Sequence, residues 1–428
     1  MSILMHKTLG IVLAGGAGER LFPLTQHRAK PAVPFGGIYR IVDVTLSNCI
    51  NSGLRRVFIL TQYKSLSLHR HIRHGWYNIV AKDLDEFIEV VPPQMRVGDN
   101  WYRGTADAVW QNLYSIHSVD RINFVMILSG DHIYKMNYFR LMRQHVEKQA
   151  DVTIVAIQVP VEQAHMFGIM RVDESGQIRD FQEKPSSLAP EFMVDGKAYA
   201  SMGIYVFNKT LLAEVLEQDA ANPNSTHDFA RDIIPRMIER YNVYAHHFVD
   251  ENKKEAQYWL DVGTLDAYYQ ANMDLVAVNP HFNLYDNEWP IRTFQPQYPP
   301  AKFVFAQKDQ RMGIALDSIV SGGCIISGGR AISAVLSPGV RINSYCDVDH
   351  SILFQHVEVG RHSRISRAII DKEVRLPERT VIGYDLEEDR KRYHVTDSGI
   401  VVVVAEDMQR EHSRGTSLAP AASGSLSF

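Results

Sequence analysis

The sequence predicts a Rossmann-like α/β domain with a mixed, mostly parallel sheet, followed by a short parallel β-helix. Two patterns along its 428 residues support this prediction. From residue 8 to about residue 275, short apolar runs alternate with amphipathic stretches of helical period, as in doubly wound sheets. Over residues 314–383 the helical pattern ends, and single aliphatic residues recur every six positions among small residues. A six-residue period is typical of the stacked coils of a parallel β-helix.

The apolar runs of the first domain predict its buried strands. Aliphatic and β-branched residues dominate residues 11–13, 57–60, 124–128 and 152–157, which we assign to strands. Residues 138–149 and 228–241 have a helical period and are expected to cover the sheet. Ligands of such sheets bind at the carboxyl ends of the strands, so functional residues are expected in the loops that follow.

Four prolines in residues 287–302 predict a linker between the two domains. We therefore divide the chain into a first domain (1–286), a linker (287–312), a β-helix (313–404) and a C-terminal tail (405–428). The six-residue steps include Ile319, Ile325 and Ala331, but the register slips between blocks, so an irregular β-domain is the alternative. From Ser413 the tail is rich in serine, glycine and alanine and is predicted to be partly disordered.

Composition excludes several classes of protein. A net charge of −4 argues against a basic nucleic-acid-binding face. We find no apolar run long enough to span a bilayer and no secretory signal in the first residues, so a cytoplasmic protein is expected. Cys49, Cys324 and Cys346 lack the spacing of metal ligands and are expected to be reduced thiols.

A glycine-rich loop after the first strand predicts an anion-binding site. Leu13 and Ala14 lead into glycines that would let backbone N–H groups approach a phosphate closely. These glycines are Gly15, Gly16 and Gly18. Arg20 and Lys30 follow, so a triphosphate cradle is expected. The spacing fits neither a Walker loop nor the dinucleotide-binding pattern, and a turn without a ligand is the alternative.

Two aspartates are candidate metal ligands. Asp131, in Ser-Gly-Asp-His, follows the strand at 124–128, where a metal-bound phosphate would lie. A turn or cap aspartate is the alternative. Asp261 lies in Tyr-Trp-Leu-Asp-Val-Gly-Thr, and the distance along the chain does not tell whether the two carboxylates meet.

These segments together resemble the signature of the sugar-1-phosphate nucleotidyltransferases, and within them the bacterial ADP-glucose pyrophosphorylases (glucose-1-phosphate adenylyltransferases). The resemblance extends from about Thr8 to about Val404. It implies a nucleotidyltransferase domain followed by a left-handed β-helix. It also implies that the protein converts ATP and α-D-glucose 1-phosphate into ADP-glucose and diphosphate, a step of bacterial glycogen synthesis.

The resemblance implies a role for each candidate residue. Arg20, Lys30 and Asp131 would be catalytic, and Asp131 and Asp261 would hold one Mg²⁺, which accepts such carboxylates. The nucleotide would contact Leu13, Ala14, Gly15, Gly16, Gly18, Gln62, Gly104 and Asp107. Glucose 1-phosphate would contact Tyr102, Gly168, Glu183, Lys184 and Ser201. Taken alone, residues 100–108 could be an ordinary helix start, and Glu183-Lys184 a surface ion pair.

Regulation and assembly are also implied by the resemblance. Related enzymes are homotetramers controlled by phosphorylated metabolites, so we expect a homotetramer with the β-helix in an interface. We assign Arg28 and Arg40 to an allosteric, phosphate-binding surface. His27 replaces a lysine that serves fructose 1,6-bisphosphate in enterobacterial-type members, and Ala405 and Gln409 replace arginines. We therefore expect weak or absent activation by this sugar bisphosphate, and activation by another phosphorylated metabolite or AMP.

Two alternatives share the same fold. One is an enzyme that uses UTP or dTTP. The strings Trp-Tyr-Arg-Gly-Thr-Ala-Asp-Ala and Ser-Met-Gly-Ile-Tyr-Val-Phe argue against it, because they resemble the ADP-glucose branch. The other is a non-catalytic regulatory subunit, which would be expected to have lost cations or metal carboxylates. The chain retains Arg20, Lys30, Asp131, Lys184 and Asp261. A bifunctional uridylyltransferase–acetyltransferase is not expected, because the solenoid is too short.

Overall fold

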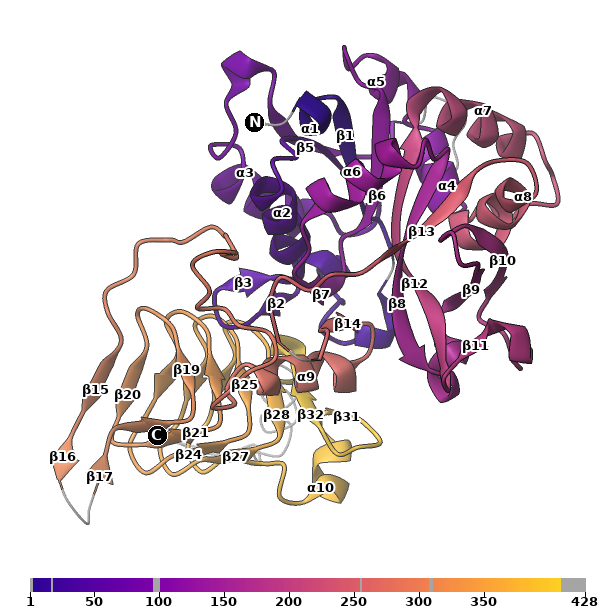
Figure 1. Cartoon of the computed structure of the whole chain (residues 1–428). Helices are drawn as coiled ribbons and strands as arrows, with labels where there is room; N and C mark the ends of the chain where they lie inside the picture. The colour runs from indigo at the N-terminus through magenta and orange to yellow at the C-terminus, as the bar shows by residue number, and fades with distance from the viewer. Residues whose placement is uncertain (1–2, 17, 95–100, 255, 308–310, 409–428) are drawn as a thin grey trace, which may run out of the picture.

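The computed structural model describes residues 3–16, 18–94, 101–254, 256–307 and 311–408. Figure 1 shows an α/β domain that contains the N-terminus, with a β-helix (orange to yellow) packed against it. Among the described residues, no helix combines the length and the apolarity that crossing a membrane requires.

The α/β domain is built on a ten-stranded mixed sheet with a parallel centre. Strand β1 pairs in parallel with β4 and β6, and β4 pairs in parallel with β5. Strand β12 runs antiparallel to β6, β8 and β9, and this makes the sheet mixed. The strands are β1 (Thr8–Ala14), β4 (Arg56–Thr61), β5 (Phe87–Val91), β6 (Phe124–Ser129), β8 (Val152–Pro160), β9 (Gly168–Val172), β10 (Ile178–Glu183), β11 (Met193–Val194), β12 (Lys197–Asn208) and β13 (Val243–His247). All four predicted strand regions lie within this set.

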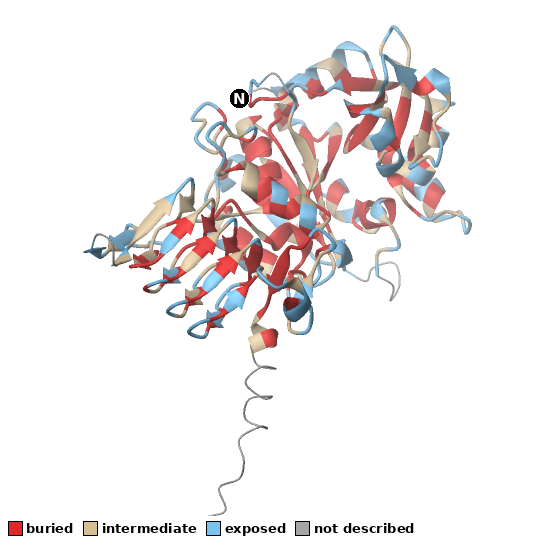
Figure 2. Ribbon diagram, turned by 90° about the horizontal axis from the view of Figure 1, so that it is seen from below, coloured by how far each residue is buried: buried red, intermediate tan, exposed pale blue. Residues whose placement is uncertain are grey.

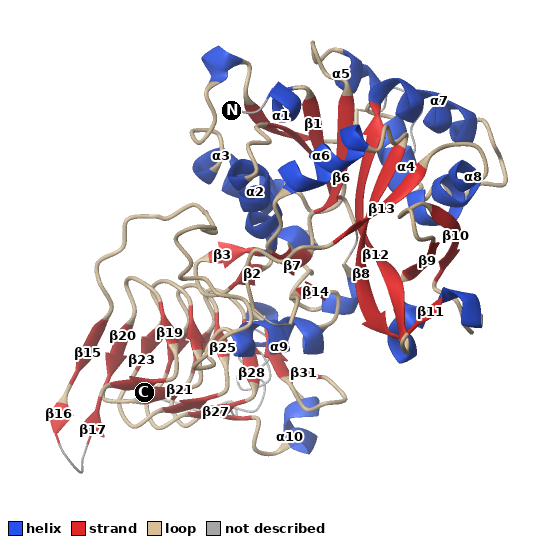
Figure 3. Cartoon of the chain, in the orientation of Figure 1, coloured by secondary structure: helices blue, strands red, loops and turns tan. Residues whose placement is uncertain are grey.

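Helices cover both faces of the sheet, as Figure 3 shows. One buried core lies under α2 (Ile41–Asn51), α3 (Leu66–Gly75) and α6 (Tyr138–Glu147). A second core lies under α4 (Thr105–Trp110), α5 (Leu113–His117), α7 (Lys209–Ala220) and α8 (Ile234–Ile238). The remaining helices are α1 (Ile3–His6), α9 (Leu265–Asp274) and α10 (Leu386–Arg390).

The helix predicted over 228–241 is interrupted. A π-helical turn, η6 (Phe229–Ile233), precedes α8, which has Pro235 in its first turn. Proline has no N–H to donate to the preceding turn, so the helix restarts there instead of continuing.

The second domain is a parallel β-helix of three sheets. The first sheet contains β15 (Lys302–Val304), β20 (Ile325–Ser327), β23 (Arg341–Ile342), β26 (Glu358–Val359) and β29 (Arg375–Leu376). The second contains β18 (Ile314–Leu316), β21 (Arg330–Ile332), β24 (Asp347–Asp349), β27 (Arg364–Ser366) and β30 (Val381–Ile382). The third contains β19 (Ile319–Val320), β22 (Val335–Leu336), β25 (Ile352–Leu353), β28 (Ala368–Ile370), β32 (Val401–Val403) and β31 (His394–Val395).

The stacking register explains the slips in the six-residue pattern. In the second sheet, Ala331 pairs with Val348, and the same ladder continues through Ile365 and Ile382. The spacing of these residues along the chain is not a multiple of six. Each of these coils is therefore one residue shorter than three hexads. The irregular β-domain is excluded.

The segment expected to be a linker is partly structured. β15 pairs in parallel with β20, so the β-helix begins inside residues 287–312. The residues before β15 are fixed along α2: Trp289 Nε1 donates to Asn48 Oδ1 at 2.8 Å, and Asn51 Nδ2 donates to Pro290 O at 2.9 Å. The prolines of this segment favour an extended backbone, which runs alongside α2.

The two domains share a buried core. The third sheet of the β-helix contributes Val335, Ile352 and Ile369, which pack with Phe35 and Tyr268 of the α/β domain. Figure 2 shows buried residues concentrated in the strands of both domains, with exposed turns at the outer ends of the coils.

Candidate active site

The two candidate metal carboxylates meet although they are far apart in the sequence. A short antiparallel pair, β7 (His132–Tyr134) and β14 (Trp259–Asp261), places Asp261 opposite His132. Lys30 Nζ lies between the carboxylates and donates to Asp131 Oδ2 at 2.6 Å and to Asp261 Oδ1 at 2.9 Å. Arg20 approaches from the glycine loop, with a guanidinium nitrogen 3.9 Å from Asp261 Oδ2. All four residues predicted from the sequence to carry the chemistry therefore gather at one point.

Electrostatics hold this cluster in its charged form. Burial lowers the pKa of Lys30, but the charges of Asp131 and Asp261 outweigh it and leave that pKa above its ordinary value. Burial alone would raise the pKa of Asp131, yet Lys30, His132 and a hydrogen bond from Ser129 hold it well below the usual range. Asp131 is thus anionic and Lys30 cationic at neutral pH.

The donor set fits a divalent cation. Ligand atoms of Asp131, His132 and Asp261 all lie within 4.8 Å of one another. Carboxylate oxygens are the ligands that Mg²⁺ prefers, and they are supplemented by substrate phosphates and water. The sequence did not single out His132 for this cluster, and its position directly after Asp131 was the available signal.

A cavity of about 180 Å³ adjoins the carboxylates. Gly168, Glu183, Lys184 and Ser201 line it, together with Asp261. These are four of the five residues expected to contact the sugar phosphate. Burial raises the pKa of Glu183, and the charge of Lys184, whose Nζ lies 3.6 Å from Glu183 Oε1, partly offsets this. The cavity therefore offers a hydrogen-bond acceptor and a cation side by side.

A bulge in β12 directs Ser201 to this cavity. The pairing of β12 with β8 shifts between Ser201 and Tyr205. Gly203 lies in the bulge with φ of +68°, a left-handed conformation that glycine adopts without strain. Trp259, Tyr205 and Phe167 add aromatic walls to the cavity. None of these three was assigned to the site from the sequence, because aromatic residues in or beside strands are usually core residues.

The residues expected to bind the nucleotide lie at the ends of β1 and β4 and at the start of α4. Gln62 adjoins Gly15, and its Nε2 lies 3.4 Å from Tyr102 O. Asp107 is buried and accepts hydrogen bonds from Arg103 and Gln111, so its carboxylate braces the 102–107 loop. Leu13 and Ala14 end β1, and Gly16 and Gly18 follow them.

Tyr102, also expected to contact the sugar phosphate, is held by Asn112. Its hydroxyl accepts a hydrogen bond from Asn112 Nδ2 at 2.9 Å. The described lining of the sugar cavity does not include Tyr102. This side chain instead packs beside the second core of the α/β domain.

The two arginines expected to bind an effector differ in access. Arg28 is buried and donates to both carboxylate oxygens of Asp371, at 2.9 and 3.0 Å. A phosphate could reach its guanidinium only by displacing that carboxylate. Arg40 lines a cavity of about 460 Å³ between the two domains. Burial lowers the pKa of Arg40 to about 10, partly offset by Asp43, so it remains a cation at neutral pH.

An acidic side chain faces His27. His27 Nε2 lies 2.5 Å from Glu406 Oε1. Ala405 precedes that glutamate, whereas Gln409 lies outside the described residues. The surface around His27 is thus less attractive to phosphate than the sequence alone indicated.

Comparison with known proteins defines the class to which this fold and site belong. A nucleotidyl transferase model matches residues 9–277, and a GlmU-like C-terminal hexapeptide model matches residues 299–403. The chain belongs to the nucleotidyl transferase family. The second match confirms the parallel β-helix predicted from the six-residue period and the left-handed form that the resemblance implied.

The relatives define the branch. The glucose-1-phosphate adenylyltransferase of Koribacter versatilis is 62% identical over 403 residues, which cover 94% of this chain and 96% of the relative. Those of Rhodopirellula baltica and Methylococcus capsulatus are 56% and 52% identical, covering 95% and 96% of this chain and 91% and 97% of the relatives. Within the nucleotidyl transferases, the chain belongs to the glucose-1-phosphate adenylyltransferases.

Proposed function

We propose that the protein transfers the adenylyl group of ATP to α-D-glucose 1-phosphate, giving ADP-glucose and diphosphate for glycogen synthesis. One observation carries the proposal. The Lys30-bridged carboxylates Asp131 and Asp261 adjoin a cavity that contains Glu183 and Lys184. A site for a triphosphate thus borders a site for a sugar phosphate.

The sugar half needs no general base. A phosphate oxygen of glucose 1-phosphate is already an anionic nucleophile, so the protein has to align it with the α-phosphate of ATP for in-line attack. Lys184 is assigned to the sugar phosphate, and Glu183 and Ser201 to ring hydroxyls. Gly168, opposite Glu183 in the β9–β10 pair, lets Phe181 and the Glu183 carboxylate approach its backbone, because a Cβ atom there would lie 2.4 Å from the Phe181 ring and 2.8 Å from Glu183 Oε2.

The nucleotide half supplies positive charge. Arg20 and Lys30 are placed to neutralise the triphosphate and the departing diphosphate. Asp131 and Asp261 would hold Mg²⁺, which supplies Lewis-acid stabilisation of the phosphate charges when bound. The glycine loop and Gln62 are assigned to the phosphates and the adenine, with Gly104 and Asp107 shaping the loop beside the base.

Turnover with different nucleotides tests the proposal. Purified protein with Mg²⁺ and glucose 1-phosphate should release diphosphate rapidly with ATP and slowly with UTP or dTTP. Equal rates with the three nucleotides would contradict the adenylyl assignment. No release with any of them would favour the non-catalytic subunit.

We further propose a cytoplasmic homotetramer with the β-helix in a subunit interface. The three cysteines are free and buried, which is typical of proteins from reducing compartments. Phe303, Met312 and Leu316 are exposed at the first coils of the β-helix, a surface suited to contact with another copy. Light scattering on the purified protein checks the mass of the assembly.

A further inference from the structure

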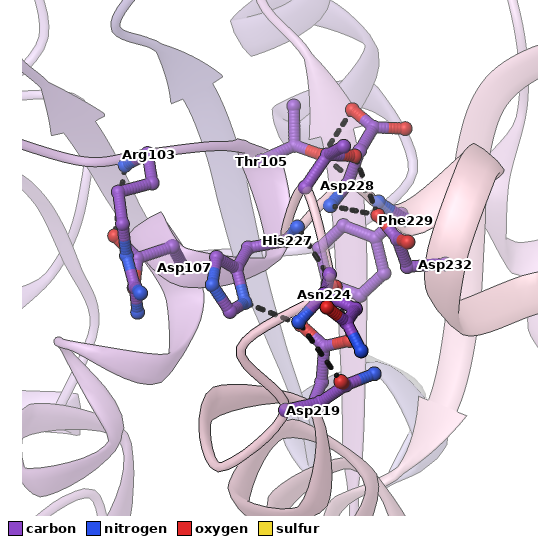
Figure 4. A network of polar contacts seen from close by, with 12 residues as sticks. Arg103, Thr105, Asp107, Asp219, Asn224, His227, Asp228, Phe229 and Asp232 are labelled. Carbon is purple, nitrogen blue, oxygen red and sulfur yellow. Dashed lines mark hydrogen bonds and ion pairs between the residues drawn. The ribbon is translucent and has the colours of Figure 1, made fainter.

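A turn at residues 225–229 connects the two halves of the proposed site, with His227 at its centre (Figure 4). His227 has φ of +57°, a left-handed conformation that is uncommon for a residue other than glycine. Its Nδ1 lies 2.8 Å from Asp219 Oδ2, and the two side chains are only 4% and 3% exposed. Ser225 Oγ donates to Asp219 Oδ1 at 2.7 Å and accepts from His227 N at 2.9 Å. A buried network from α7 thus fixes the conformation of the turn.

The turn docks on the loop assigned to the nucleotide. His227 O accepts hydrogen bonds from Ala106 N at 2.8 Å and Asp107 N at 3.4 Å, where α4 begins. A Cβ atom at Gly104 would lie 2.3 Å from His227 O, so only glycine permits this approach. Thr105 Oγ1 donates to Asp228 Oδ2 at 3.0 Å. The position of residues 104–107 is therefore set by the turn.

The other end of the turn reaches the sugar-phosphate cavity. Asp228 Oδ1 accepts from Ala230 N at 2.9 Å, and Ala230 lines that cavity. The ring of Phe229 packs against Tyr205, another lining residue, with centroids 5.8 Å apart. The same turn thus contacts both the nucleotide loop and residues that line the sugar cavity.

We propose that His227, held by Asp219, is a positioning residue through which ATP and glucose 1-phosphate strengthen each other's binding. This inference rests on the proposed function. A sugar phosphate that orders Ala230 and Asp228 also fixes Thr105 and Ala106, and hence the nucleotide loop. Because coupling between two binding sites is reciprocal, ATP must tighten sugar-phosphate binding by the same factor.

The test measures this coupling directly. Titration calorimetry gives the Kd of α,β-methylene-ATP in the presence of Mg²⁺, with and without saturating glucose 1-phosphate. We expect the sugar phosphate to tighten binding at least about fivefold in the wild type. His227→Leu removes the contact with Asp219, and the ratio of the two Kd values should fall to about one. His227→Asn keeps a donor near the position of Nδ1 and tolerates a positive φ, so it should restore most of the coupling.

Two further variants guard against a general loss of folding. Asp219→Asn keeps the buried volume and should reduce the ratio even if His227→Leu does not fold. Arg236→Gln is the matched control, because Arg236 contacts the same Asp219 carboxylate at 3.4 Å from a half-exposed position, and it should keep the wild-type ratio.

The outcomes separate the inference from the proposed function. An unchanged ratio in folded His227→Leu, with both affinities weakened equally, would show a purely structural role and overturn the inference. A wild-type ratio of one would also overturn it. Failure of the wild type to form ADP-glucose would instead refute the proposed function.

Discussion

Arg28 and Asp371 form a bidentate ion pair across the domain boundary, in which Arg28 Nη1 donates to Asp371 Oδ1 at 2.9 Å and Nη2 donates to Oδ2 at 3.0 Å. Both side chains are nearly inaccessible to solvent. Breaking such a pair by removing one partner leaves a buried charge without compensation. The pair therefore ties the glycine-loop segment to the β-helix.

Asp371→Ala should lower the free energy of unfolding by about 3 kcal/mol, because Arg28 would remain buried and unpaired. Urea denaturation followed by circular dichroism measures the change. Lys372→Ala, at the exposed neighbouring position, is the control and should have little effect. The double variant Arg28→Met, Asp371→Leu should recover most of the stability, and an equally unstable double variant would argue against the ion pair.

Asp131→Asn should reduce kcat at least about a hundredfold while leaving the fold and ATP binding largely intact. The substitution keeps the volume but removes the charge that Lys30 contacts and that would hold Mg²⁺. Steady-state kinetics and calorimetric titration with ATP measure the two effects. Asp195→Asn, on an exposed turn, is the control. Near-normal kcat in the Asp131 variant would refute its assignment as a metal ligand.

Lys184→Ala should raise the KM for glucose 1-phosphate roughly ten- to a hundredfold, with little effect on the KM for ATP. Only the sugar phosphate loses its counter-charge. Lys197→Ala, at an exposed end of β12, should leave both constants unchanged. Equal increases for the two substrates would indicate that Lys184 has a structural role.

Titration of His145 should lower the free energy of unfolding in mild acid. This side chain is 1% exposed, and burial lowers its pKa to about 4 from 6.5, outweighing Asn208 and Asp151, which raise it. Between these pH values the unfolded chain binds a proton here and the folded protein does not, so the free energy of unfolding rises with pH. Neutral His145 makes its full contribution to the free energy of unfolding above pH 6.5. This contribution is lost as the pH falls towards 4, and amounts to at most about 3 kcal/mol.

Urea denaturation at pH 7.5 and pH 4.5 measures this loss. His145→Gln, which cannot titrate, should lose less stability between the two pH values than the wild type. His69→Gln, at a less buried position, is a suitable control. An identical loss in the His145 variant and the wild type would show that other groups are responsible.

Millimolar fructose 1,6-bisphosphate should activate the enzyme weakly or not at all. Unlike a lysine, His27 carries no permanent charge, and Glu406 Oε1 lies 2.5 Å from its Nε2. Activity assays with increasing fructose 1,6-bisphosphate test this. His27→Lys should increase the response, because a lysine would place a fixed cation at this position. Strong activation of the wild type would contradict the charge-based argument, whereas activation by AMP or another phosphorylated metabolite would agree with it.

Local patterns in the sequence were sufficient for the strands and for the β-helix. Residues 124–128 and 152–157 are apolar enough to be strands in any context. The aliphatic repeat that includes Ala331 can still be recognised although each coil is one residue shorter than three hexads. The break before α8 was harder to foresee. Residues 228–241 have helical periodicity throughout, and only Pro235 interrupts the hydrogen bonds.

The arrangement of the active site could be predicted only in part from the sequence. Asp131 could be placed at a strand end, but its proximity to Asp261 depends on the β7–β14 pair, which joins segments far apart in the chain. Tyr102 and Arg28 could not be placed from motifs alone, because their partners Asn112 and Asp371 are selected by packing. The resemblance supplied roles for residues, whereas tertiary contacts decide which side chains remain accessible.

The segment along α2 has a consequence for the modularity of this protein. Asp43 accepts a hydrogen bond from Thr293 Oγ1 at 2.6 Å, and Asn48 binds both Trp289 and the backbone of Tyr134 in β7. A catalytic fragment that ended near residue 286 would lose these partners and leave buried polar groups unsatisfied. The catalytic domain is therefore not an interchangeable module, and recombining domains between related enzymes has to transfer this segment together with α2.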